Sequence, residues 1–162
     1  MTKPPRDGEQ SLGFDPAAHT RDGVIFIGTL HTGWAPGRAP RNLRQSRAQG
    51  GGAGRVVLEA PYRAGLRGLT VGQAIWLILW FDKSRRDLIV QAPRHAEEPR
   101  GTFALRSPVR PNPIAIEAVR ITSLDHETGE IGVDATDAFD GTPVLDIKPW
   151  LDGIDIPPEP GD

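Results

Sequence analysis

The chain has no cysteine, and only three lysines accompany its sixteen arginines. The absence of cysteine excludes disulfide bonds, cysteine metal ligands and cysteine nucleophiles. The longest apolar run, Ala74–Phe81, is far shorter than the ~20 residues that span a bilayer. No apolar segment follows the first residues, so they do not resemble a signal peptide. We therefore expect a soluble, cytoplasmic protein.

Several common site motifs are also missing. The four histidines, His19, His31, His95 and His126, are not spaced like a pair of metal ligands, so we expect no metal. No P-loop occurs, and no G-x-G-x-x-G opens a helix, which disfavours nucleoside triphosphates and Rossmann-type dinucleotides. No G-x-S-x-G nucleophile elbow is present either.

Arginine dominates the positive charge, although the net charge is only -2. Arginine suits bidentate contact with phosphates and carboxylates. A GC-rich coding bias explains most of this excess, because it raises Arg, Ala, Gly and Pro together, so local placement matters more. Segment 38–47 holds four arginines in ten residues and is the best local candidate for phosphate contact with RNA. The alternative is a disordered basic loop.

Short β-branched runs separated by turn residues predict a mostly β fold, with a single β-barrel of short strands, long inserted loops and one or two short helices. The expected strands are 24–30, 56–58, 73–81, 87–92, 101–105, 114–121, 131–135 and 144–147, with helical turns in 61–69. We expect a flexible N-terminal arm (1–21), a barrel domain (22–156) and a C-terminal tail (157–162). Stretch 32–54 has no hydrophobic period and predicts a long functional or disordered loop.

Two dense turn motifs are the most informative part of the sequence. The first, Arg106–Ile114, contains three prolines, which fix the backbone and leave it little entropy to lose. Stiff loops with charged side chains can hold a polar ligand in one pose. Arg106 and Arg110 are therefore candidates for binding a carboxylate or phosphate, and Asn112 for contacting one fixed partner. Alternatively, both arginines are ordinary surface residues.

The second motif, Asp137–Trp150, gathers carboxylates beside a turn. Asp140-Gly141 is a strong turn signal that needs no ligand. The turn alone does not explain why Asp137, Asp140 and Asp146 cluster with Lys148. Such carboxylates are natural acceptors for ribose hydroxyls or an ammonium group, whereas Lys148 could simply pair with one of them. A further site candidate, Asp82, directly follows the long apolar run.

These motifs resemble the signature of the TsaA-like family (YaeB/TrmO, also called VirR-like). The matching residues are Arg-Pro-Asn-Pro-Ile at 110–114 and Asp-Gly-Thr-Pro-x-x-Asp-Ile-Lys-Pro at 140–149. The resemblance extends from about residue 23 to residue 155. Family members are S-adenosylmethionine-dependent methyltransferases built on a β-barrel. The characterised branch methylates the exocyclic nitrogen of threonylcarbamoyl-adenosine beside the anticodon of tRNA. The resemblance thus implies S-adenosyl-L-methionine as cofactor, tRNA as partner and a homodimer.

The resemblance also implies site residues, position by position. The family's Pro-Arg-Gln corresponds to Pro40-Arg41-Asn42, and its Phe-His step to Phe81-Asp82. The implied cofactor-binding residues are Pro40, Arg41, Asn42, Asp82, Lys83, Arg106, Ile116, Thr136, Asp137, Ala138 and Phe139. The substrate-binding candidates are Arg41, Arg44, Arg110, Asn112, Asp140 and Lys148. No catalytic base is assigned.

This chain departs from the family pattern at some of these positions. Asn42 replaces Gln, Asp82 replaces His, Ala115 replaces Gly and Trp150 replaces Tyr. The chain also ends soon after the second motif, whereas members that modify tRNA continue into a further C-terminal region. Two alternatives therefore stay open: methylation of a different RNA or small molecule, and binding of S-adenosylmethionine without catalysis.

Overall fold

The computed structural model describes residues 4–13, 23–50, 52–94 and 96–160. The chain divides into two compact units, one made of residues 1–24 and 80–115 and the other of residues 25–79 and 116–162. The expected N-terminal arm and C-terminal tail lie partly outside the described residues.

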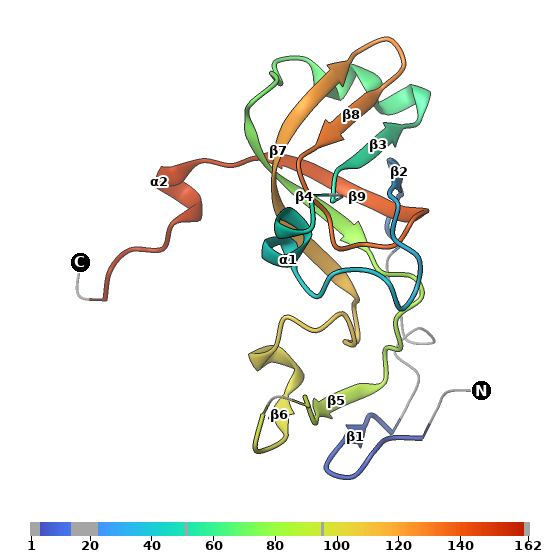
Figure 1. Cartoon of the computed structure of the whole chain (residues 1–162), viewed down its shortest axis with the longest axis vertical. Coiled ribbons are helices and arrows are strands. Elements are labelled where there is room, and N and C mark those ends of the chain that lie inside the picture. Colours follow the sequence, from blue (N-terminus) through green and yellow to red (C-terminus); the bar gives the residue numbers. More distant parts are fainter. Residues whose placement is uncertain (1–3, 14–22, 51, 95, 161–162) are drawn as a thin grey trace. The chain divides into compact units, whose positions relative to one another are not determined.

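The larger unit is built around a closed β-barrel (Figure 1). Its strands close in the order β2-β3-β8-β7-β4-β9, and the neighbours with a resolved register are antiparallel. The strands are β2 (Gly28–His31), β3 (Gly54–Leu58), β4 (Ala74–Trp80), β7 (Ile114–Asp125), β8 (Glu130–Val133) and β9 (Thr142–Pro149). The expected mostly β barrel with few short helices is confirmed.

The barrel core follows the two-residue period of its strands. Along β4, Ile75, Leu77 and Leu79 are fully buried, while Trp76 and Trp80 are half-buried. Although β4 is apolar on both faces in sequence, which favours burial of both, only one face packs into the core. The other face accommodates large side chains, since the rings of Trp76 and Trp150 lie 4.8 Å apart.

Two expected strands differ from the structure. Strand β2 begins at Gly28 instead of Val24, and the side chains of Val24, Ile25 and Phe26 are largely exposed. A Cβ at Gly28 would lie 2.3 Å from the carbonyl oxygen of Val57, so the close approach of β2 to β3 requires glycine there. Residues 101–105 form mainly a 3-10 turn, η3 (Thr102–Ala104), because the Thr102 hydroxyl is buried and donates to the Leu88 carbonyl.

Short helices complete the larger unit. The expected helical turns are present as η2 (Ala60–Leu66), which lies at one end of the barrel (Figure 1). Two further helices were not expected, namely α1 (Leu43–Ala48) and α2 (Asp152–Asp155). None of the residues of α2 is buried, and this helix lies outside the barrel wall (Figure 1). No helix among the described residues is long and apolar enough to cross a membrane.

The smaller unit contains a three-stranded antiparallel sheet and the proline-rich motif. The sheet has the order β1-β5-β6, with β1 (Gln10–Ser11), β5 (Leu88–Gln91) and β6 (Arg100–Gly101). The buried Gln91 amide donates to the Thr102 hydroxyl at 2.9 Å and to the Val109 carbonyl at 2.6 Å. This side chain therefore fastens the proline-rich loop to the sheet.

Candidate functional site

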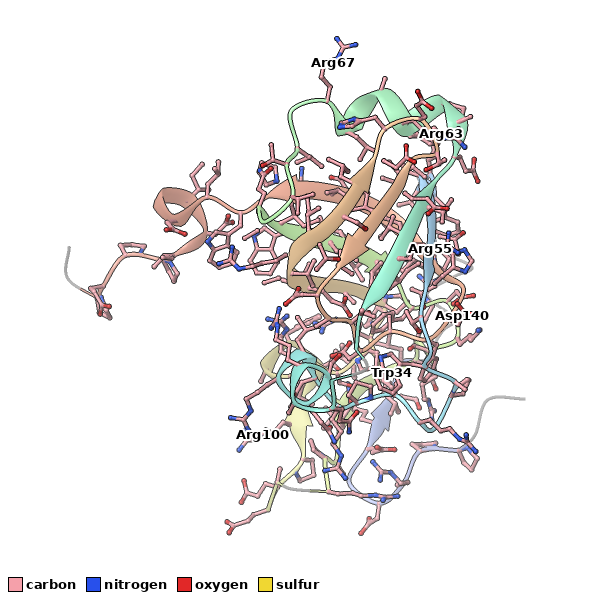
Figure 2. All side chains as sticks on the ribbon, turned by 45° about the horizontal axis from the view of Figure 1, so that its top comes forward. Trp34, Arg55, Arg63, Arg67, Arg100 and Asp140 are labelled. Carbon is pink, nitrogen blue, oxygen red and sulfur yellow. The ribbon has the colours of Figure 1, made fainter. Side chains whose placement is uncertain are left out.

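The segment that joins β8 to β9, residues 134–141, contains four of the implied cofactor-binding residues. Thr136 and Ala138 are buried, Asp137 and Phe139 are partly exposed, and Asp140 is exposed. Gly141 ends the segment with a φ of +81°, a conformation that favours glycine. Figure 2 shows Asp140 and Trp34 toward the end of the barrel opposite Arg63 and Arg67. We call residues 134–141 the site segment.

Thr136 connects the site segment to three other parts of the unit. Its carbonyl oxygen accepts hydrogen bonds from the indole nitrogen of Trp34 at 3.0 Å and from the hydroxyl of Ser46 at 2.8 Å. Its own hydroxyl donates to a carboxyl oxygen of Glu117 at 3.1 Å and accepts from the Ala138 N–H. Because each of these atoms is engaged, the backbone of the site segment is fixed before any ligand binds.

Glu117 lies behind the site segment on β7 and is only 2% exposed. Its Oε1 atom accepts from the Thr136 hydroxyl and from the backbone N–H of Asp137, both at 3.1 Å. Burial, together with the neighbouring charge of Asp137, raises the pKa of Glu117 well above its ordinary value. Ile116, its neighbour along the strand, lies on the opposite face of β7 and is 42% exposed.

The far end of the site segment is anchored to the chain that follows β2. The Asp140 carboxylate accepts from the backbone N–H of Thr32 at 3.0 Å and lies 3.4 Å from the His31 imidazole. The backbone N–H of Asp140 in turn donates to the Trp34 carbonyl at 2.9 Å. The Thr32 N–H, more than the charge of His31, lowers the pKa of Asp140. Asp140 therefore fixes this turn as an ionised carboxylate.

The arginine-rich stretch is ordered into α1, which the sequence did not predict. The Asn42 side chain caps this helix by accepting from the Gln45 N–H at 2.9 Å, and the Gln45 side chain accepts from the Arg41 N–H at 2.8 Å. The helix carries Ser46 and Arg47, and Arg47 binds the Asp134 carboxylate at 2.8 Å. Thus the implied residues Pro40, Arg41 and Asn42 lead into a helix that is bonded to the site segment.

These contacts also assign roles to two candidates. Asn42 caps the N-terminus of α1, whatever else it contacts. Its neighbours Arg41 and Arg44 are exposed. On β9, Lys148 lies 3.2 Å from the Asp146 carboxylate, and both side chains are substantially exposed. The pairing of Lys148 with a neighbouring carboxylate, which the sequence left open, is therefore present.

The remaining candidates belong to the smaller unit. In the proline-rich loop, Arg106 is exposed, whereas Arg110 donates to the carbonyls of Leu105 and Ser107, both at 3.2 Å. Arg110 therefore braces its own loop. The Asn112 side chain accepts from Arg86, which also lies over the Trp80 ring at 5.4 Å from its centroid. After β4, Asp82 and Lys83 are both exposed.

The sequence reasoning missed the residues that support the site segment, chiefly Glu117, Trp34 and Ser46. Glu117 could have been found from the phase of β7, because Val119 and Ile121 point inward and Glu117 belongs to the same alternating set. A carboxyl group at an inward position of a barrel strand marks a polar site in the core. Trp34 and Ser46 lie in a stretch without period, where no pattern marks their orientation.

The site offers carboxylates and backbone groups in a fixed arrangement, which suits a polar ligand with hydroxyl groups. Among the described residues, no group of three His, Asp or Glu side chains could hold a metal ion. The site segment itself offers hydrogen-bonding groups and the carboxyl groups of Asp137 and Asp140.

Comparison with known proteins identifies chains that are similar to this one. The family model of the tRNA-methyltransferase O N-terminal domain matches residues 37–156. A protein of Rhizobium radiobacter, named a probable S-adenosyl-L-methionine-binding protein VirR, is 30% identical over 126 residues, 78% of this chain and 69% of the relative. A Pyrococcus horikoshii protein, named a probable S-adenosyl-L-methionine-binding protein, is 44% identical over 104 residues, 60% of this chain and 73% of the relative.

Solved structures agree with these sequence relatives. The crystal structure of TrmO from Pseudomonas aeruginosa is similar with a TM-score of 0.64 and 28% identity. The similarity covers 86% of this chain and 60% of that one, so the chain spans a little over half the length of these TrmO structures.

Proposed function

Since the chain belongs to the tRNA-methyltransferase O (TsaA-like) family, whose members bind S-adenosyl-L-methionine, we propose that it N-methylates threonylcarbamoyl-adenosine beside the anticodon of tRNA. S-adenosyl-L-methionine is the methyl donor in this proposal. The observation that carries the proposal is the site segment, whose backbone is fixed by bonds to Trp34, Ser46 and Glu117. The family resemblance assigns cofactor contacts to its residues Thr136–Phe139.

The cofactor fits the donor set of this segment. Asp137, partly exposed beside a buried carboxyl group, is suited to accept hydrogen bonds from the ribose hydroxyls. From the family resemblance we propose that Phe139 and Ile116 contact the adenine and that Arg106 binds the methionine carboxylate. We carry the same role to Pro40, Arg41, Asn42, Asp82, Lys83, Thr136 and Ala138 from the family resemblance.

Methyl transfer makes modest demands on the protein. The cofactor supplies an electrophilic methyl group on a sulfonium, and the transfer is an in-line displacement that depends on positioning. The rigid site segment provides that positioning. The nitrogen of a carbamoylated base is more acidic than an amine, so water or a weak base suffices to take its proton, and no side chain is assigned that role.

The proposed tRNA contacts rest on the exposed arginines that precede and begin α1. Arg41 and Arg44 would meet the RNA backbone, with Arg110, Asn112, Asp140 and Lys148 as further substrate candidates. Four of these, Arg110, Asn112, Asp140 and Lys148, already have intramolecular partners. The family resemblance also supports a homodimer, which light scattering on the purified protein would test.

The central test compares modified nucleosides from tRNA of a deletion strain and its parent by mass spectrometry. We expect N-methylated threonylcarbamoyl-adenosine to disappear and its unmethylated precursor to accumulate in the deletion strain. Unchanged levels of the methylated nucleoside would refute the proposed substrate. Independently, calorimetry should show that Arg106→Ala weakens S-adenosyl-L-methionine binding at least about tenfold, since an arginine–carboxylate pair is removed. Unchanged affinity would remove Arg106 from the site.

A second function remains a candidate because the curated relatives are named only as S-adenosyl-L-methionine-binding proteins. In that case the chain binds the cofactor without transferring its methyl group, or methylates another RNA or small molecule. Purified protein with labelled cofactor and total RNA distinguishes these possibilities. Label in RNA other than tRNA, or in no RNA, would favour this alternative.

A further inference from the structure

Glu117 is a buried acid that has no ion-pair partner among the described residues. Its side chain points inward from β7, in register with Val119 and Ile121, and is 2% exposed. No described arginine, lysine or histidine forms an ion pair with it. An unpaired carboxylate in such a place is strongly disfavoured. The protein therefore has to stabilise this group in another way.

The two oxygens of Glu117 are in different situations. Oε1 accepts from the Thr136 hydroxyl and from the Asp137 N–H, both at 3.1 Å. Oε2 is fully buried, and no N–H or O–H group of the described residues donates to it. The Asp137 carboxyl group is the neighbour that, after burial, does most to raise the pKa of Glu117, through its charge and side-chain hydrogen bonding. Two carboxylates cannot share a hydrogen bond unless one of them carries a proton.

The proton belongs on Glu117, because Glu117 is buried whereas Asp137 is partly exposed and its charge is better solvated. The raised pKa of Glu117, caused first by burial and then by the charge of Asp137, agrees with this.

The cations on α1, β2 and β7 are engaged with other partners. From α1, Arg47 binds the Asp134 carboxylate at 2.8 Å and the Ala118 carbonyl at 2.9 Å. From β2, His31 lies 3.4 Å from Asp140. Arg120, on β7 itself, is exposed and donates to the Gly72 carbonyl through its side chain. None of these cations forms an ion pair with Glu117.

We propose that Glu117 is a positioning residue that acts in its neutral form. Its Oε2 atom donates a hydrogen bond to the Asp137 carboxylate, while its Oε1 atom accepts hydrogen bonds from the Asp137 N–H and the Thr136 hydroxyl. One carboxylic acid thus fixes both the backbone and the side chain of Asp137. The inference rests on the proposed function, in which Asp137 meets the ribose. Loss of the proton places two carboxylates together, which drives the Asp137 side chain away from Glu117 and weakens cofactor binding.

The test measures S-adenosyl-L-methionine affinity by calorimetry from about pH 6 to pH 9 in three proteins. Above the pKa of Glu117 the wild type should bind the cofactor more weakly, because Glu117 must take up one proton when the cofactor binds. The affinity should then fall about tenfold for each further pH unit. Glu117→Gln keeps an acceptor and a donor, so it should bind within a few-fold of the low-pH wild type and lose this pH dependence. Glu117→Leu offers neither and should bind at least about tenfold more weakly at every pH.

Two results would overturn the proposal: a wild-type affinity with the same pH profile as Glu117→Gln over a range in which Glu117 loses its proton, or a Glu117→Gln variant as weak as Glu117→Leu near pH 6. Glu130→Gln is the matched control, since Glu130 is a partly exposed acid paired with Arg55 at 2.7 Å. This control should leave affinity and pH profile unchanged.

A measurement without ligand separates the proposal from the proposed function. Infrared spectra near pH 7 should contain the carbonyl stretch of a protonated carboxylic acid, which disappears in Glu117→Gln and persists in Glu130→Gln. If the wild type binds no S-adenosyl-L-methionine but this band is present, the proposed function fails and the neutral state of Glu117 stands. If the band is absent from the wild type, the Glu117 proposal fails whatever the protein binds.

Discussion

The indole nitrogen of Trp34 donates a hydrogen bond to the carbonyl oxygen of Thr136 at 3.0 Å, although 102 positions separate the two residues. The same oxygen accepts from Ser46 at 2.8 Å, so two points of the stretch between β2 and β3 are tied to one carbonyl group. The site segment therefore depends for its shape on a loop that is distant in sequence. This dependence can be measured.

Trp34→Phe removes the indole donor and keeps an aromatic ring in a similar place. We expect a loss of about 1 kcal/mol in the free energy of unfolding, because one partly buried hydrogen bond is lost while Ser46 still satisfies the carbonyl. Cofactor affinity should fall several-fold as the site segment loosens. Urea denaturation and calorimetry measure the two effects.

Trp150→Phe provides the control for that substitution. The Trp150 indole nitrogen donates to the Asp152 carboxylate, two residues away on the exposed side of the chain. The same chemical change there removes only an exposed hydrogen bond and keeps an aromatic ring against Trp76, so it should cost less stability than Trp34→Phe. Equal effects of the two substitutions would show that the bond to Thr136 has no special part in fixing the site.

Gly52→Ala tests how closely α1 approaches the chain that leads into β3. A Cβ at Gly52 would lie 1.9 Å from the Ser46 hydroxyl and 2.9 Å from the Ser46 carbonyl oxygen. Ser46 would have to move, which breaks its bond to Thr136. We expect a loss of about 1–3 kcal/mol in the free energy of unfolding, measured by urea denaturation, together with weaker cofactor binding.

Gly33→Ala is the matched substitution in open space, since nothing lies within 4 Å of the added methyl group. It should change stability by about 0.5 kcal/mol or less. A Gly52→Ala protein as stable as Gly33→Ala would mean that Ser46 adjusts freely and is not a fixed support of the site segment.

The barrel could be predicted from sequence because its strands carry strong local signals. The inward residues of β4, Ile75, Leu77 and Leu79, recur with period two, and turn residues such as Gly141 separate the strands. Helix α1 could not be predicted in this way, because its only buried residue is Ser46 and it has no apolar stripe. Its signal is a single capping residue, Asn42, which is easily overlooked in a loop rich in arginine.

A family motif could suggest residues of the candidate site, but no motif could suggest its nonlocal support. Thr136–Phe139 were proposed from the motif, whereas Glu117 contacts Thr136 and Asp137 across 19 and 20 positions. A local sequence pattern does not show which distant groups will hydrogen-bond to a buried carbonyl or carboxyl group. Arg110 was suggested as a ligand contact by its place in a motif, and the motif gave no sign that its side chain also braces the loop.

The stability of the wild type should fall as pH rises above the ordinary pKa of glutamate, 4.5. Glu117 has a raised pKa in the folded protein, so between 4.5 and that raised value the folded state binds a proton that the unfolded state has lost. The free energy of unfolding then decreases by about 1.4 kcal/mol for each pH unit, until Glu117 itself ionises. Below pH 4.5 this contribution is fully present.

Urea denaturation across this pH range, in wild type and Glu117→Gln, isolates that contribution. The glutamine side chain in the variant does not ionise, so the difference in unfolding free energy between the two proteins should change steadily with pH in favour of the variant. Glu130→Gln should run parallel to the wild type, because Glu130 is paired with Arg55 at the surface. A constant difference between wild type and Glu117→Gln would show that Glu117 has an ordinary pKa.

Arg44→Ala tests the proposed contact between the α1 region and tRNA. Arg44 is an exposed cation near the start of α1, and the capped helix holds its backbone in place. If it contacts a phosphate, its removal should weaken tRNA binding and reduce the slope of log affinity against log salt concentration by about 1.

Arg67→Ala is the control. It removes an exposed cation at the η2 end of the barrel, shown in Figure 2 away from Trp34, and should leave both the affinity and the slope unchanged. Fluorescence anisotropy with labelled tRNA at several salt concentrations measures them. Equal losses of tRNA affinity in the two variants would mean that binding depends on the total charge of the protein and not on the surface around Arg44.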